Sequence, residues 1–83
     1  MPTYFFHSRQ GDETFEDPEG TVLSDIQAAR RYALSAAREF LAHSIRFDCL
    51  PPDAIIVADQ SGRELLTVLT IEMLPDNIRK LLR

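Results

Sequence analysis

The chain has a single cysteine, Cys49, among its 83 residues. One cysteine excludes an intramolecular disulfide and any metal site built from several thiolates, so the reducing cytosol is the expected compartment. Glycine is also scarce, with three residues in the whole chain, and these form no glycine-rich loop of the kind that binds phosphates. These absences lead us to predict no disulfide, no metal and no other cofactor.

Long apolar runs are absent as well. No stretch approaches the roughly 20 apolar residues that a membrane-spanning helix needs, and residues 1–7 lack the basic start and apolar stretch of a signal peptide. The net charge of −4 gives the chain no overall attraction to phosphates or to anionic lipid surfaces. We therefore expect a cytoplasmic protein without a membrane segment.

What the sequence does contain is typical of a folded domain. Hydrophobic residues make up 45% of the chain and charged residues 27%, which is ordinary for a globular protein and argues against disorder. A chain of this length forms one domain, 1–83, whose core is thin enough for a partner to extend. We place the core at residues 3–70 and expect residues 71–83 to be a C-terminal extension, with a short helix from Pro75.

The clearest element is a long helix that begins at Ser24. Residues 24–27 match a capping box, in which Ser24 and Gln27 each accept from the other's backbone amide. The helix is expected to end near Arg46 or Phe47, because two prolines follow at positions 51 and 52. At about 100° per residue, its apolar stripe consists of Ile26, Ala29, Ala33, Ala36, Ala37, Phe40 and Leu41. The four alanines let the helix approach the layer that it covers.

Four segments are predicted to be strands, two before the helix and two after it. Aromatic and β-branched residues mark them, and they cover residues 3–9, 14–16, 54–59 and 64–71. A turn with aspartate first and glycine fourth, at residues 59–62, joins the last two strands into a hairpin. The order is therefore β-β-α-β-β, and the simplest α+β assembly is an antiparallel sheet with the long helix packed on one face.

Both faces of the predicted hairpin are apolar, whereas one helix covers only one face of a sheet. The other face needs the C-terminal helix, a second copy of the chain or a partner protein to cover it, and we favour a second copy. The interaction surface predicted in this way consists of Phe5, Ile56, Leu66 and Val68, or of the opposite set if the strands are turned over.

Residues that carry chemistry are few and poorly spaced for catalysis. Neither His7 nor His43 is paired with a second ligand at metal-binding spacing. Cys49 follows the end of the helix, where the helix dipole opposes formation of a thiolate. The acidic residues between Asp12 and Glu19 lack the spacing of a calcium loop and are expected to form a solvated loop. We therefore predict that the chain is not an enzyme and leave the roles of the two histidines and the cysteine open.

Three arginines on the helix support an alternative. Arg31 and Arg38 are seven residues apart and lie on one side of the helix, with Arg30 nearby. Helix-borne arginines of this kind contact phosphates in nucleic-acid-binding proteins. The negative net charge and the lack of interleaved aromatics favour a solvated face instead, so nucleic acid is the less favoured partner.

Four short patterns resemble a family of small, uncharacterised bacterial proteins known as a domain of unknown function. They are Tyr4-Phe5-Phe6, Asp17-Pro18-Glu19-Gly20, Leu23-x-Asp25 before the helix, and Asp59-x-x-Gly62-Arg63-x-Leu65-Leu66-Thr67-Val68. The resemblance covers residues 3–70 and implies the fold and the cytoplasmic placement, but no activity. The element order also resembles that of HicB-type antitoxin domains, which bind a partner protein through a similar sheet and helix.

Two hypotheses of function are favoured over a third, a small enzyme with His7 or His43 as its base, which would need a pocket that holds one of them beside a carboxylate. The first is a non-catalytic module that dimerises or binds another protein through an uncovered sheet face or an edge strand. The second is a nucleic-acid-linked, antitoxin-like regulator that uses Arg30, Arg31 and Arg38. The first needs an exposed apolar surface, and the second needs an exposed basic one.

Overall fold

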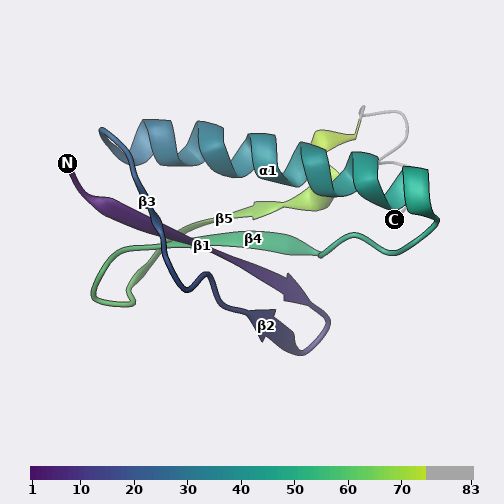
Figure 1. Cartoon of the computed structure of the whole chain (residues 1–83), viewed down its shortest axis with the longest axis horizontal. Coiled ribbons are helices and arrows are strands. Elements are labelled where there is room, and N and C mark those ends of the chain that lie inside the picture. Colours follow the sequence, from purple (N-terminus) through teal and green to yellow (C-terminus); the bar gives the residue numbers. More distant parts are fainter. Residues whose placement is uncertain (75–83) are drawn as a thin grey trace.

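The computed structural model of the chain describes residues 1–74 and has an α+β fold, with one long helix on one face of an antiparallel sheet (Figure 1). Its elements in chain order are β1 (Thr3–Gln10), β2 (Glu13–Phe15), β3 (Thr21–Val22), α1 (Ile26–Phe47), β4 (Ala54–Ala58), β5 (Glu64–Leu69) and the short 3₁₀ helix η1 (Thr70–Met73). The predicted fold class is confirmed. The short helix expected from Pro75 onward lies outside the described residues. Neither helix in the described part is long and apolar enough to cross a membrane.

All strand pairs in the sheet are antiparallel. The strand order is β2-β1-β4-β5, and the two-residue β3, which the sequence did not predict, pairs with the first residues of β1. Strands β1 and β4 occupy the middle of the sheet, with Phe5 opposite Ala58 and His7 opposite Ile56. Phe5, His7 and Ile56 therefore lie on one face, because directly opposed residues in a pleated sheet share a face.

The predicted hairpin between β4 and β5 is confirmed, together with its turn. The backbone N–H of Gly62 donates to the carbonyl oxygen of Asp59 at 3.0 Å. The Asp59 carboxylate accepts from the N–H and the hydroxyl of Ser61 and from the N–H of Arg63. The Ser61 hydroxyl is the main cause that lowers the pKa of Asp59, and the backbone donors add to it. β5 ends at Leu69, two residues earlier than predicted, because the chain turns there into η1.

The core lies between the helix and one face of the sheet. Three alanines of α1, at positions 29, 33 and 37, are completely buried against the sheet. Their small side chains let the helix lie close to the strands, so the large side chains of the core come from the sheet. The sheet contributes Tyr4, Ile55, Val57 and Val68 to this core.

The predicted interaction surface divides between the two faces of the sheet. Its members are Phe5, Ile56, Leu66 and Val68. In the observed register Val68 lies opposite Ile55 and Leu66 lies opposite Val57, so both face the helix and contribute to the core. The placement of Leu66 and Val68 on the uncovered face was therefore wrong, while Phe5 and Ile56 do lie there. Because both faces of β5 are apolar, the pattern alone did not fix which of them turns inward.

The helix begins one residue later than predicted and ends where expected. Asp25, not Ser24, is the N-cap, and its carboxylate accepts from the N–H of Ala28 at 2.8 Å. A carboxylate also complements the positive end of the helix dipole, which explains why it caps the helix instead of the serine hydroxyl. The helix ends at Phe47, after which Asp48 takes a left-handed conformation with a φ of 51°.

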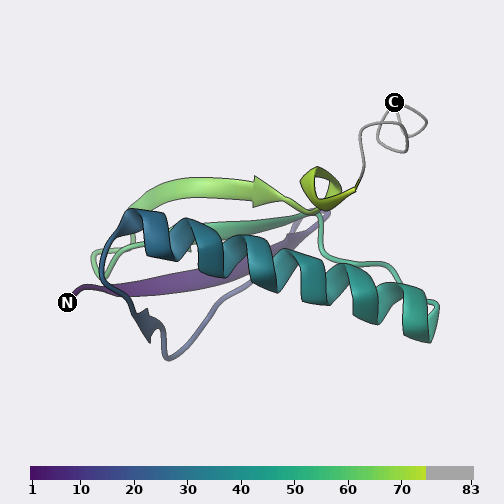
Figure 2. The same cartoon turned by 90° about the horizontal axis from the view of Figure 1, so that it is seen from above.

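The helix is longer than the sheet that it covers. Its 22 residues span about 33 Å, whereas the five residues of β4 span about 17 Å. Figure 2 shows the last turns of α1 projecting past the ends of the strands, before the chain returns to β4. The C-terminal half of the helix therefore carries side chains that the sheet does not reach.

Candidate functional site

The outer face of the sheet, opposite the helix, is partly covered by the chain's own residues 16–20. Asp17 holds this segment in place. Its N–H donates to Nδ1 of His7 at 3.0 Å. Its carboxylate accepts hydrogen bonds of 3.2 Å from three backbone N–H groups, those of Phe6, Glu19 and Gly20. We call residues 16–20, held by these bonds, the Asp17 latch.

The hydrogen bonds of the Asp17 latch explain the pKa of Asp17 and the tautomer of His7. Partial burial raises the pKa of the Asp17 carboxyl, but the three backbone donors outweigh it and hold the pKa below its ordinary value. The neutral His7 ring carries its proton on Nε2, because Nδ1 accepts from the Asp17 N–H. His7 therefore cannot act as a general base through Nδ1 without breaking the latch.

Gly20 lets the latch lie close against the sheet. Its φ is 74°, a conformation that favours glycine. A Cβ at this position would lie 2.7 Å from Cγ2 of Thr3 and 2.9 Å from Cε2 of Phe5. Phe5 is half-buried, and Ile56 is only 2% exposed. The outer face is therefore not the open apolar surface that the sequence predicted at Phe5 and Ile56.

What remains open on the outer face is a shallow groove of about 390 Å³ with a charged lining. Its ionisable residues are His7, Arg9, Glu16, Asp17, Asp59 and Glu64. Among residues 1–74, no three histidine, cysteine, aspartate or glutamate side chains are grouped so as to hold a metal ion. Because His7 and Asp17 are both committed to the latch, this lining is better suited to hydration than to acid–base chemistry.

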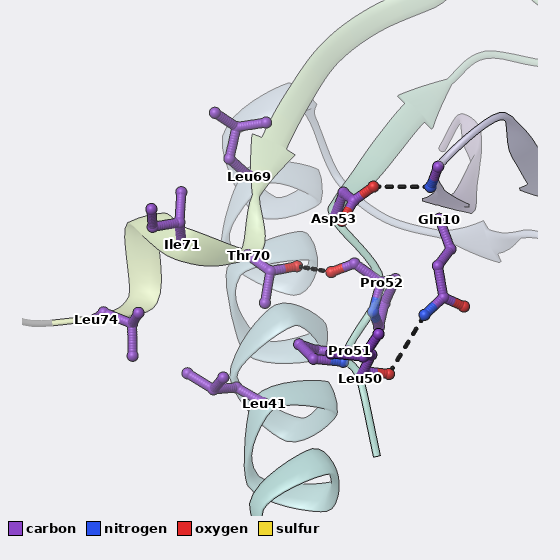
Figure 3. A pocket seen from close by; sticks show the side chains of 11 residues that line it. Gln10, Leu41, Leu50, Pro51, Pro52, Asp53, Leu69, Thr70, Ile71 and Leu74 are labelled. Carbon is purple, nitrogen blue, oxygen red and sulfur yellow. Dashed lines mark hydrogen bonds between the residues drawn. The ribbon is translucent and has the colours of Figure 1, made fainter. Parts of the chain in front are cut away.

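A larger groove lies beside the C-terminal half of α1, between the helix, the connection to β4, and η1 (Figure 3). Its volume is about 900 Å³, and its apolar lining consists of Leu41, Leu50, Pro51, Pro52, Leu69, Ile71 and Leu74. Hydrogen bonds fix its walls. The Thr70 hydroxyl donates to the carbonyl oxygen of Pro52 at 2.6 Å, and the Asp53 carboxylate accepts from the N–H of Gly11 at 2.8 Å.

Large apolar side chains are exposed around the end of α1. Ile45 is 76% exposed, Phe47 61% and Leu50 83%, and Phe40 is 40% exposed further up the helix. Phe40 and Phe47 lie on the same stripe of the helix as the buried Ala33 but stay partly exposed, whereas Ile45 is turned about 160° away from Phe47. Single exposed apolar residues are common, whereas two large aromatic side chains exposed on one stripe of a helix can form an interaction site.

Two residues whose roles were left open also lie near the helix end. The His43 ring packs against Phe47 with ring centroids 4.6 Å apart, and the Arg46 guanidinium lies 5.7 Å from the Phe47 ring centroid. Cys49 is exposed just after the helix, and its N–H donates to the carbonyl oxygen of Ser44. His43 thus extends the apolar surface through its tilted ring contact with Phe47, which its position at the flank of the predicted stripe indicated only in part.

The three arginines of the alternative hypothesis are all exposed on α1. They are Arg30, Arg31 and Arg38. Arg31 and Arg38 lie along one side of the helix, whereas Arg30 is turned about 100° away from Arg31. The helix therefore aligns two of the three, and their role in nucleic-acid binding stays a prediction.

The fold and its surfaces define a small α+β domain, whose five-stranded antiparallel sheet is covered on one face by a helix that extends beyond it. The chain belongs to the family described as domain of unknown function DUF6894, which matches residues 3–71. This confirms the predicted membership of an uncharacterised family. Comparison with curated proteins finds no match, and neither does comparison with solved structures. Function is therefore argued from the chain's own surfaces.

Proposed function

We propose that the chain is a non-catalytic, cytoplasmic interaction module that self-associates through the exposed C-terminal half of α1. The observation that carries this proposal is the exposure of two large aromatic side chains, Phe40 and Phe47, on one stripe of the C-terminal half of α1. The proposal keeps the predicted dimerisation and moves its surface from the outer sheet face to the helix.

The size of this surface suits a weak dimer. Complete burial of one large apolar side chain contributes about 1.5–3 kcal/mol. Phe40 and Phe47 are 40% and 61% exposed, so each copy has about one side chain's worth of surface left to bury. Two copies therefore gain about 3–6 kcal/mol, the low end of the 4–15 kcal/mol or so of freedom lost on association. A reversible dimer whose population depends on protein concentration is the expected result.

The outer sheet face is a poorer candidate for the same role. The Asp17 latch lies over Phe5, and the groove beside it is lined by charged side chains that stay hydrated at low cost. At the end of the helix, by contrast, aromatic and aliphatic side chains are exposed, and the groove beside them has an apolar lining (Figure 3).

Sedimentation velocity of the full chain over a concentration series tests the proposal. We expect a reversible shift from monomer to dimer in the wild type, and a strong weakening of the dimer in Phe47→Ser. Phe15→Ser is the matched control, because Phe15 is similarly exposed but belongs to β2. A wild-type chain that stays monomeric throughout, or an equal loss in both variants, would contradict the proposal.

A nucleic-acid-linked regulator is the second candidate, favoured by the exposed alignment of Arg31 and Arg38 on one side of α1. Its signature is binding to DNA or RNA that weakens with added salt and is lost when both arginines become alanine. No binding at low ionic strength would rule this candidate out.

A further inference from the structure

The exposed half of α1 has the residue spacing of a helix-pairing seam. Ala36, Phe40, His43 and Phe47 follow one another at intervals of four, three and four residues. This alternation places residues along one stripe in a coiled coil. Phe40, His43 and Phe47 are exposed and Ala36 is partly buried, and a shallow concavity of the helix surface is lined by Ala36, Phe40, His43 and Glu39. We call Ala36, Phe40, His43 and Phe47 the α1 seam.

Charges of opposite sign lie along one flank of the α1 seam. Glu39 directly precedes Phe40, Arg46 directly precedes Phe47, and both charged side chains are exposed. The other flank is formed by Ala37 and Ser44, which are buried. A second helix can therefore reach the seam only from the flank that carries the two charges.

We propose that the α1 seam packs antiparallel against the α1 seam of a second copy of the chain. In this arrangement Phe40 lies opposite the second copy's His43, and Ala36 lies opposite the second copy's Phe47, so large and small side chains alternate. Glu39 then lies beside the second copy's Arg46, and the two-fold symmetry repeats this ion pair. This arrangement gives the geometry of the self-association proposed above, and it rests on that proposed function.

A parallel pairing explains the same residues less well. It places Phe40 against Phe40 and His43 against His43, and it sets Glu39 beside the uncharged Ser44 of the other helix. The antiparallel pairing also sends the two sheets to opposite ends of the dimer, because the C-terminal turns of each helix project past its own sheet (Figure 2). Charge and shape therefore both favour the antiparallel arrangement.

A second copy of the chain fits the α1 seam better than a generic apolar partner, because the charges of Glu39 and Arg46 are complementary to those of the second copy's Arg46 and Glu39. The seam from Ala36 to Phe47 is only about 18 Å long, so apolar contacts alone make a small interface. Two ion pairs form only with a helix that carries the same charges in the reverse order, and α1 itself is such a helix.

Charge reversal tests the arrangement. We expect Glu39→Arg and Arg46→Glu, each alone, to weaken self-association by about tenfold or more, because each variant juxtaposes like charges twice. An equal mixture of the two variants is expected to recover wild-type affinity, since one chain then carries two basic side chains at these positions and the other two acidic ones. Arg38→Glu, on the opposite side of the helix, is the control and should self-associate like the wild type.

The results of these experiments distinguish a failure of the antiparallel arrangement from a failure of the proposed self-association. Far-UV circular dichroism first establishes that each variant is folded. A wild-type dimer that Phe47→Ser weakens, but that the single charge reversals leave unchanged or that mixing fails to restore, overturns the antiparallel seam and leaves the proposed self-association standing. A wild-type chain that is monomeric at every concentration overturns both, and it points to another protein or to residues 75–83 as the occupant of the seam.

Discussion

The outer face of the sheet and the C-terminal half of α1 both present apolar side chains, but among residues 1–74 only the outer face of the sheet is covered by another segment. At the outer face, residues 16–20 lie against Phe5 and are held there by hydrogen bonds of Asp17. At the helix end, Phe40 and Phe47 continue the stripe of the buried alanines and stay partly exposed. A short segment with one carboxylate can thus close a sheet face, whereas a helix that is longer than its sheet leaves part of its apolar stripe exposed.

Forcing the outer face open has the largest expected effect on stability. In Gly20→Ala the added methyl group lies 2.7 Å from Cγ2 of Thr3 and the residue keeps its positive φ. We expect a loss of about 2–4 kcal/mol in the free energy of unfolding, measured with urea. Gly11→Ala is the matched control, because Gly11 also has a positive φ but open space around its Cβ position. It should lose only about 1 kcal/mol, and equal losses would show that the latch is not closely packed.

Acid is expected to weaken the same face by a smaller amount. Because the fold lowers the pKa of Asp17, the ionised carboxylate stabilises the folded state at pH values above the ordinary pKa of an aspartate. This contribution is lost as the pH falls below about 4 and through the lowered pKa. Asp17→Asn should therefore be less stable than the wild type near neutral pH, and the gap should shrink in acid.

Urea unfolding at a series of pH values measures this gap. Asp12→Asn, at the exposed turn between β1 and β2, is the control for removal of one surface carboxylate. A gap between Asp17→Asn and the wild type that does not change with pH would contradict a role for the ionised carboxylate in the latch.

The smallest effect on the stability of the monomer is expected at the helix end. Phe47→Ser removes a side chain that lies beyond the sheet, so the free energy of unfolding of the dilute chain should change by no more than about 0.5 kcal/mol. The same variant should nevertheless lose self-association. A loss of stability as large as that of Gly20→Ala would mean that Phe47 packs within the monomer, and the contrast between the two regions would fail.

The elements with local signals could be predicted from the sequence. The length of α1 follows from its periodicity and from the prolines after it, and the turn of the hairpin follows from Asp59 and Gly62. The cap was misassigned by one residue because Ser24 and Asp25 are both good N-caps, and only the folded chain shows that Asp25 bonds to Ala28.

The Asp17 latch and the exposure of the helix end both depend on contacts between segments far apart in the sequence, which no local pattern encodes. Asp17 was expected in a solvated loop, but it bonds to Phe6 and His7, residues of β1 that lie ten or eleven positions away in the sequence. The exposure of Phe47 depends on how far the sheet extends beneath the helix. The apolar stripe predicted a helix with one face packed on the sheet, but it did not indicate where along the helix the sheet ends.

NMR of the amide signals of α1 as the protein is concentrated shows most directly whether this helix mediates self-association. We expect the signals of residues 36–47 to shift with concentration and reach a plateau, while those of Phe5 and His7 stay constant. Signals of α1 that are constant at every concentration, or shifts centred on the outer face of the sheet, would contradict self-association through α1.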